Sequence, residues 1–274
     1  MQRVAIHSVP RSGSSWLGQI FNSSPQVIYK YQPLFSYAFK NALSPQSTRA
    51  EIIAFFESIA TRKDDFLDQT EAVQRGIYPQ FEKRQPGSHV VYKEVRYHHI
   101  LENLLAQDEE LKIIGLVRHP LAVLASWKMA PKEFKPEWDF SAEWRSAPSK
   151  NQGRPEEFFG FDKWLEVYRL FDRLSQQFSH RFRLLFYADL LRDTAAVVRQ
   201  LFDWCGLEWE GQTERFLAVS RGEDRRDTYS VYNTKQHDDA WQHVLPQMVI
   251  HEVRTQLSGE PRAHLDSMIE AASS

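Results

Sequence analysis

The chain has 274 residues, of which 42% are hydrophobic and 13% aromatic, enough to bury a substantial core in one large α/β domain or two small ones. Its formal net charge of -2 argues against general nucleic-acid binding, which needs a strongly basic surface. The single cysteine, Cys205, excludes an intrachain disulfide and any zinc site built from several thiolates.

Short apolar segments alternate with amphipathic ones along the chain. The strands expected from β-branched and aromatic runs cover residues 3–8, 27–31, 89–95, 111–117 and 182–187. The expected helices cover 14–21, 33–42, 49–61, 160–178 and 188–205, with another from Pro120 onward and a mostly helical tail from 237. This alternation predicts a parallel sheet with helices on both faces, within one domain of residues 1–274.

Residues 129–151 interrupt this pattern. They contain Pro131, Pro136 and Pro148, several aromatic residues beside charged ones, and little periodicity. The stretch is too aromatic for a disordered linker, so we expect an ordered insert or lid.

A turn at residues 8–13 joins the first strand to a helix that opens at Ser14. Such a turn aims backbone N–H groups and the positive end of a helix at one point, which suits a phosphate or another anion. The turn departs from the nucleoside-triphosphate loop G-x-x-x-x-G-K-(S/T), because Ser8 replaces the first Gly and Ser14 replaces the Lys. The alternative is a helix N-cap formed by Ser12 or Ser14.

The motif P-(R/K)-S-G-(S/T)-(S/T)-W, here residues 10–16, resembles the 5′-phosphosulfate loop of sulfotransferases that use 3′-phosphoadenosine 5′-phosphosulfate (PAPS). The resemblance implies a P-loop-type fold of three layers, with a central parallel sheet flanked by helices. It also implies a donor-binding loop made of Arg11, Ser12, Gly13, Ser14, Ser15 and Trp16. In the family, the Trp of this loop stacks on the adenine; the alternative for Trp16 is core packing.

A second block of residues lies at 115–127. Arg118 ends a buried strand, at the edge where ligands bind in open α/β sheets, and Ser126 follows in the next helix. This pair resembles the 3′-phosphate site of the same family. Without that resemblance, Arg118 could instead pair with a carboxylate, and Ser126 could merely fill a helix position.

Two later segments extend the resemblance to about Gly222. The sequence F-Y-A-D-L at 186–190 resembles the family's F-Y-E-D-L, which implies that Tyr187 lies near the adenine. A further segment resembles the family's R-K-G element, which implies that Arg221 and Gly222 hold the 3′-phosphate. The family's basic pair is reduced here to one arginine, although arginines at 225–226 could substitute.

The resemblance implies in-line transfer of a sulfuryl group from PAPS to a hydroxyl or amine of an acceptor, with release of 3′,5′-ADP and no metal. Arg11 is the candidate to stabilise the leaving phosphate, and its role would be electrostatic because arginine does not give up its proton.

A general base must also remove the proton of the acceptor. We expect Glu94 to do so, because several carbohydrate sulfotransferases use a Glu at a strand end. The K-T-H pattern of the aryl and steroid enzymes is broken, since Val95 takes the His position. His98 and His99 are alternative bases, and Lys93 could contact the sulfonate or only pair with Glu94.

The segment at 31–34 resembles the E-P-L element near the acceptor site of carbohydrate sulfotransferases, although Gln32 replaces the Glu. We therefore expect a carbohydrate or another small hydroxylated acceptor. Two alternatives are a P-loop nucleotide kinase or NTPase, which would need a lysine at Ser14, and a nucleotide-binding module that has lost catalysis.

The N-terminus leads directly into the first strand, and no signal peptide or bilayer-spanning run is apparent. We expect a cytoplasmic protein without nucleic-acid or membrane partners. A homodimer is a family-level expectation.

Overall fold

The computed structural model describes residues 1–223, 229–232, 238–258 and 260. Its centre is a five-stranded sheet in the order β2-β3-β1-β4-β5, and every neighbouring pair of strands is parallel. The strands are β1 (Gln2–His7), β2 (Val27–Tyr31), β3 (His89–Glu94), β4 (Lys112–Val117) and β5 (Phe182–Phe186). The parallel sheet predicted from the sequence is therefore confirmed, with strand bounds that differ by one residue or not at all from most of those expected.

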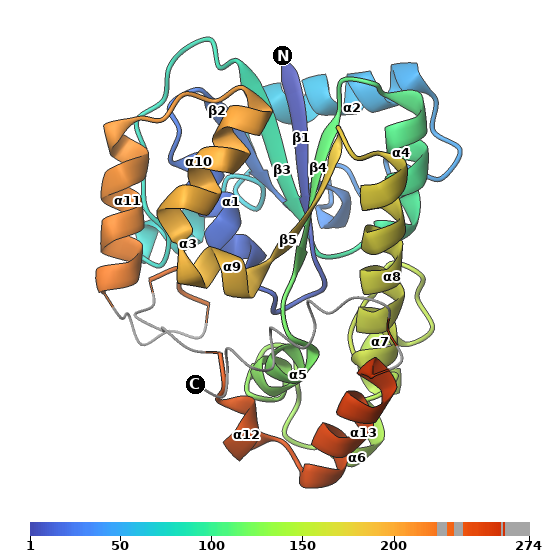
Figure 1. Cartoon of the computed structure of the whole chain (residues 1–274). Helices are drawn as coiled ribbons and strands as arrows, with labels where there is room; N and C mark the ends of the chain where they lie inside the picture. The colour runs from blue at the N-terminus through green and yellow to red at the C-terminus, as the bar shows by residue number, and fades with distance from the viewer. Residues whose placement is uncertain (224–228, 233–237, 259, 261–274) are drawn as a thin grey trace.

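Helices cover both faces of the sheet (Figure 1). One face carries α1 (Ser14–Asn22), α10 (Thr194–Cys205) and α11 (Gly211–Gly222), and the other carries α2 (Arg49–Thr61), α4 (Leu101–Gln107) and α8 (Phe161–Gln177). Side chains of β1 alternate between two hydrophobic cores, with Val4 and Ile6 on the α1 side and Ala5 on the α2 side. Both faces are covered, so nearly every residue of β1 and β3 is buried, including the polar residues at the ends of these strands.

Further elements gather beyond the carboxyl ends of the strands (Figure 1). They are α5 (Pro120–Lys128), α6 (Phe140–Glu143), α7 (Pro148–Asn151), α12 (Trp241–Val244) and α13 (Gln247–Leu257). The irregular stretch 129–151 contributes Phe134, Phe140 and Trp144 to the core on the α2 side. The stretch is thus ordered by packing, and it places its loops beside the ends of the strands.

Two helix predictions were wrong. Instead of a helix over 33–42, the chain forms a single 3-10 turn at Pro33–Phe35 and then bends. The Ser36 hydroxyl donates to the Pro33 carbonyl at 2.7 Å and accepts from the Phe39 N–H at 3.2 Å, so a side chain takes hydrogen bonds that a helix would need.

The helix expected over 188–205 is two helices, α9 (Tyr187–Arg192) and α10, separated at Asp193. The Asp193 carboxylate accepts from the Ala196 N–H at 3.0 Å and caps the second helix. Three further helices, α3 (Thr70–Gln74), α4 and α11, are not predicted by the sequence pattern. Of these, α3 is a five-residue helix that buries none of its residues, so it has no apolar face to detect.

None of the helices in the described ranges combines the length and the apolar character needed to cross a membrane.

Candidate functional site

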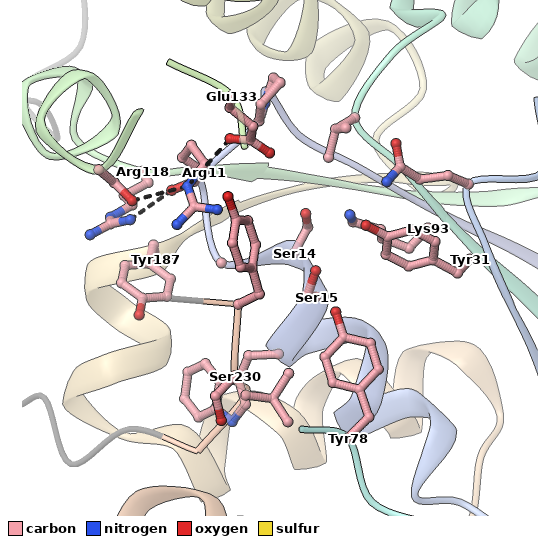
Figure 2. A pocket seen from close by; sticks show the side chains of 18 of the residues that line it. Arg11, Ser14, Ser15, Tyr31, Tyr78, Lys93, Arg118, Glu133, Tyr187 and Ser230 are labelled. Atoms are coloured by element: carbon pink, nitrogen blue, oxygen red, sulfur yellow. Dashed lines mark hydrogen bonds and ion pairs between the residues drawn. The ribbon is translucent and has the colours of Figure 1, made fainter. Parts of the chain in front are cut away.

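A cavity of about 370 Å³ lies at the carboxyl ends of β1, β3 and β4, within the size range of small-molecule sites. Its walls come from the loop before α1, the strand ends, α9, α11 and the segment 229–231. The lining includes Arg11, Gly13, Ser14, Ser15, Trp16, Tyr31, Gln32, Lys93, Val95, Arg96, Arg118, Ser126, Glu133, Tyr187 and Arg221. In Figure 2 the arginines 11 and 118 lie with Tyr187 on one side, while Lys93 and Tyr31 lie on the other.

The loop before α1 has a backbone conformation that only a glycine adopts easily at one position. Gly13 has φ 89°, and a Cβ added there would lie 2.5 Å from Cε2 of Tyr187. The missing side chain lets the Tyr187 ring rest against the loop, while Ser14 and Ser15 open the first turn of α1 onto the cavity. Ser12 is fully buried, and its hydroxyl has no hydrogen-bond partner within the described ranges.

The two blocks singled out in the sequence meet at this cavity. Nη1 of Arg118 donates to the Arg11 carbonyl at 2.6 Å, and Nε of Arg11 donates to the Ser126 hydroxyl at 3.1 Å (Figure 2). Arg118 follows the end of β4 and Ser126 lies in α5, so the sheet edge brings together residues more than 100 positions apart in the chain.

Arg118 holds a carboxylate in a two-point contact. Its Nε and Nη2 donate to the two oxygens of Asp238 at 2.7 and 2.5 Å. Only 9% of Arg118 is exposed. Burial opposes its charge, but Asp238 outweighs this effect, and the pKa of Arg118 lies above its ordinary value. The carboxylate of Asp238 thus occupies the position at Arg118 where the sequence predicted a phosphate. The alternative prediction, that Arg118 pairs with a carboxylate, also describes this contact.

A second cationic group lies beside two aromatic rings. Trp16 donates from Nε1 to the Ser220 hydroxyl at 3.1 Å and meets the ring of Tyr187 edge to face, with 6.3 Å between ring centroids. The guanidinium of Arg221 lies 5.9 Å from the Trp16 ring. Its Nη1 is buried and has no hydrogen-bond partner among the described residues, which suits an anionic ligand. Gly222 ends α11 and is not part of the described lining.

Arg225 and Arg226, the substitutes named for the second basic residue, lie outside the described residues.

Lys93 and Val95 of the β3 end both line the cavity. Nζ of Lys93 lies 4.5 Å from the centroid of the Tyr31 ring. Burial lowers the pKa of Lys93 below its ordinary value, while the neighbouring Glu94 opposes this shift. The strand end therefore presents an amine of reduced basicity to the cavity.

The structure does not bring Glu94 or His98 into the part of the lining that it describes. Successive side chains of a strand point to opposite faces, so Glu94 is turned away from the face that Lys93 and Val95 share. Its Oε1 accepts from the Val95 N–H at 3.1 Å, and burial raises its pKa. Nδ1 of His98 lies 3.1 Å from Nδ1 of His7 in the core, where burial lowers the pKa of both rings.

Two further lining features were not predicted as site residues. Arg96 donates from Nη1 to Oε1 of Gln32 at 2.9 Å and from Nε to Oε2 of Glu157 at 3.1 Å. Glu133 projects from the stretch 129–151 (Figure 2). Gln32, the partner of Arg96, lies in the segment that resembles the E-P-L element, and this segment was the sequence feature that pointed to this part of the cavity. Glu133 belongs to no recognisable motif.

Across the described ranges, no group of three or more His, Cys, Asp or Glu side chains is arranged to hold a metal ion.

Comparisons with known proteins give a consistent result. A family model described as "Sulfotransferase family" matches residues 3–211. Carbohydrate sulfotransferase 5 of Mus musculus is 25% identical, and carbohydrate sulfotransferase 6 of Homo sapiens is 26% identical. Each of the two alignments covers 93% of this chain and 78% of the relative.

Solved structures confirm the fold class. Mouse sulfotransferase SULT7A1, crystallised with PAP, superposes with a TM-score of 0.58 at 11% identity and covers 99% of this chain and 89% of that one. The sulfotransferase domain of the Synechococcus PCC 7002 olefin synthase gives a TM-score of 0.52 at 18% identity, covering 94% and 95%.

Proposed function

Because the chain belongs to the sulfotransferase family, we propose that it transfers a sulfuryl group from PAPS to a hydroxyl of a carbohydrate or a similar small acceptor. The family resemblance read from the sequence is confirmed by the family match. The names of the curated relatives support a carbohydrate acceptor, and the PAP complex of the mouse enzyme supports PAPS as the donor.

The observation that carries the proposal is the junction of Arg11, Arg118 and Ser126. It joins the two predicted phosphate sites in one cavity. A donor that carries both a 5′-phosphosulfate and a 3′-phosphate requires such an arrangement. Arg118 already binds an anion through two parallel hydrogen bonds, which is the geometry that arginine offers to a phosphate. The 3′-phosphate would take the place of the Asp238 carboxylate, and Nη1 of Arg221, which has no hydrogen-bond partner among the described residues, would give a further bond.

The other end of the donor fits the loop before α1. The donor supplies an activated sulfuryl group, and the chain supplies position and charge. Gly13 has no side chain, so the backbone of the loop can lie close to the donor. Ser14 and Ser15 present hydroxyls to the cavity, and the first turn of α1 faces it. Lys93 lies across the cavity from Arg11, so basic groups flank the space where negative charge would shift during transfer (Figure 2).

The acceptor would occupy the remaining part of the cavity, beside Tyr31, Gln32 and Arg96. An aromatic ring, an amide and a guanidinium together provide a stacking surface and several hydrogen-bond donors. These groups suit a hydroxylated ring better than an extended apolar molecule.

The kinase or NTPase alternative has no comparable support. Ser14 stands at the position of the lysine that such enzymes place on the β- and γ-phosphates, and it opens α1 here as the sequence predicted.

The proposal is tested by transfer of radioactive sulfate from labelled PAPS to a panel of neutral sugars: glucose, galactose, N-acetylglucosamine and lactose. We expect transfer by the wild type and a rise in the KM for PAPS of at least about tenfold in Arg118→Ala, because charged hydrogen bonds are lost. Arg173→Ala is the matched control, since Arg173 makes a similar two-point contact with Glu102 at the surface. A wild type that binds Mg·ATP and transfers no sulfate would contradict the proposal.

A further inference from the structure

The cavity contains a carboxylate that neither predicted phosphate site explains. Among the described lining residues, Glu133 is the acidic one, and it comes from the stretch 129–151 (Figure 2). Glu94, the base expected from the sequence, faces the core instead, and the amide of Gln32 has no basic oxygen to take up a proton. The cavity therefore offers one candidate carboxylate for acid–base chemistry within its described lining.

The backbone of Glu133, five residues beyond the end of α5, is tied to that helix and to Ala130 by hydrogen bonds. Its N–H donates to the Ala130 carbonyl at 2.9 Å, and its own carbonyl accepts from Nε1 of Trp127 at 3.2 Å. Trp127 is only 1% exposed. A base must keep a fixed distance to the proton that it removes, and anchoring by a buried indole provides this.

The carboxylate itself is oriented by charge and retains an open position. Its Oε2 lies 3.7 Å from Nε of Arg11, too far for a hydrogen bond, and this buried oxygen has no hydrogen-bond partner in the described part of the chain. Glu133 also interacts electrostatically with Lys93 across the cavity. A buried carboxylate oxygen without a donor is costly unless a ligand supplies one, and a hydroxyl of the acceptor would do so.

We propose that Glu133 is the general base of the reaction, a role that rests on the proposed function. The hydroxyl of the acceptor gives its proton to the Glu133 carboxylate as its oxygen forms the new bond to sulfur. The bond from sulfur to the bridging oxygen of the donor phosphate breaks, and its electron pair leaves with 3′,5′-ADP. Arg11, which belongs to the loop before α1 and lies beside Glu133, balances the charge that shifts toward the phosphate.

The test compares Glu133→Gln, the shorter carboxylate Glu133→Asp, and the control Glu137→Gln. Glu137 lies on the same stretch, and its side chain is 67% exposed beside Lys135. Three quantities are measured: affinity for 3′,5′-ADP by calorimetry, kcat for transfer from PAPS to the best sugar of the panel, and the reverse transfer from 4-nitrophenyl sulfate to 3′,5′-ADP. The reverse reaction releases 4-nitrophenolate, a stable anion that needs no proton from the enzyme.

We expect Glu133→Gln to bind 3′,5′-ADP like the wild type, to lose about 100-fold or more in transfer to the sugar, and to keep the reverse reaction within about fivefold. Glu133→Asp should retain more sugar transfer than Glu133→Gln, and Glu137→Gln should match the wild type. Sugar transfer that survives in Glu133→Gln, or equal losses in both directions, would overturn the assignment. A wild type that fails to bind 3′,5′-ADP would instead refute the proposed function.

Discussion

Replacing Gly13 by alanine should damage the donor site in a way that the geometry specifies. The new Cβ would lie 2.5 Å from Cε2 and 2.9 Å from Cδ2 of Tyr187. Tyr187 cannot simply turn aside, because its ring packs edge to face on Trp16 and lies 5.1 Å from the guanidinium of Arg118. The clash would therefore displace the ring from its present place, which the family resemblance puts near the adenine.

The free-energy cost has two parts. A side chain at φ 89° strains the backbone, and occupying the left-handed region costs about 1–2 kcal/mol for an L-residue. Forcing a methyl group into a filled space costs about 1–3 kcal/mol more. Gly153 separates the two parts, since it has φ 68° and nothing within 4 Å of an added Cβ. Gly153→Ala should show the backbone cost alone.

The assay measures urea unfolding and calorimetric binding of 3′,5′-ADP for both variants. Gly13→Ala should lower the free energy of unfolding by about 1–3 kcal/mol more than Gly153→Ala does and weaken 3′,5′-ADP binding at least about tenfold. Adding Tyr187→Ala to Gly13→Ala should recover part of the stability. Binding within twofold of the wild type in Gly13→Ala, with a stability equal to that of Gly153→Ala, would refute the assigned contact between loop and ring.

Three other perturbations have defined outcomes. Asp238→Asn should tighten 3′,5′-ADP binding by about tenfold in calorimetry, because a phosphate no longer has to displace a carboxylate from Arg118; unchanged affinity would place the phosphate elsewhere. Burial lowers the pKa of His7 from 6.5 to about 3. Between these two pH values the imidazole is protonated in the unfolded chain and neutral in the folded chain. The free energy of unfolding measured in urea should therefore decrease by about 2 kcal/mol as the pH is lowered from 6.5 to 5. A folded His7→Asn variant should show a smaller decrease over the same pH range. Lys93→Met should lower kcat by about 100-fold with unchanged 3′,5′-ADP affinity, and an unchanged kcat in initial-rate assays would remove Lys93 from the transfer step.

The fold was predictable because its strands contain short runs of apolar, largely β-branched residues and its longer helices have one apolar face. Strand β4 illustrates this, since five of its six residues are buried and its run of Ile, Gly, Leu and Val needs no tertiary information to recognise. The helix predicted at 33–42 failed because Ser36 competes for backbone hydrogen bonds, an effect that periodicity does not register.

The gathering of the motif residues at one cavity was predictable because these residues stand in local motifs at turns and strand ends. Arg118, at the end of a strand, and Gly13, in a turn, occupy positions that the topology carries to one sheet edge. The position of the cavity's carboxylate was not predictable in the same way. Which face of β3 meets the cavity, and hence that Glu94 is absent from the described lining, does not follow from a motif, and Glu133 is brought to the cavity only by the packing of an irregular stretch on α5.

We infer that this cavity binds a nucleotide with phosphate at both the 3′ and the 5′ position. Calorimetric titration of the wild type and of Arg118→Ala with 3′,5′-ADP, 5′-AMP and Mg·ATP tests it most directly. We predict that the wild type binds 3′,5′-ADP at least about 100-fold more tightly than 5′-AMP, and that Arg118→Ala abolishes the difference. Equal affinities for the two nucleotides, or a preference for Mg·ATP, would contradict the account.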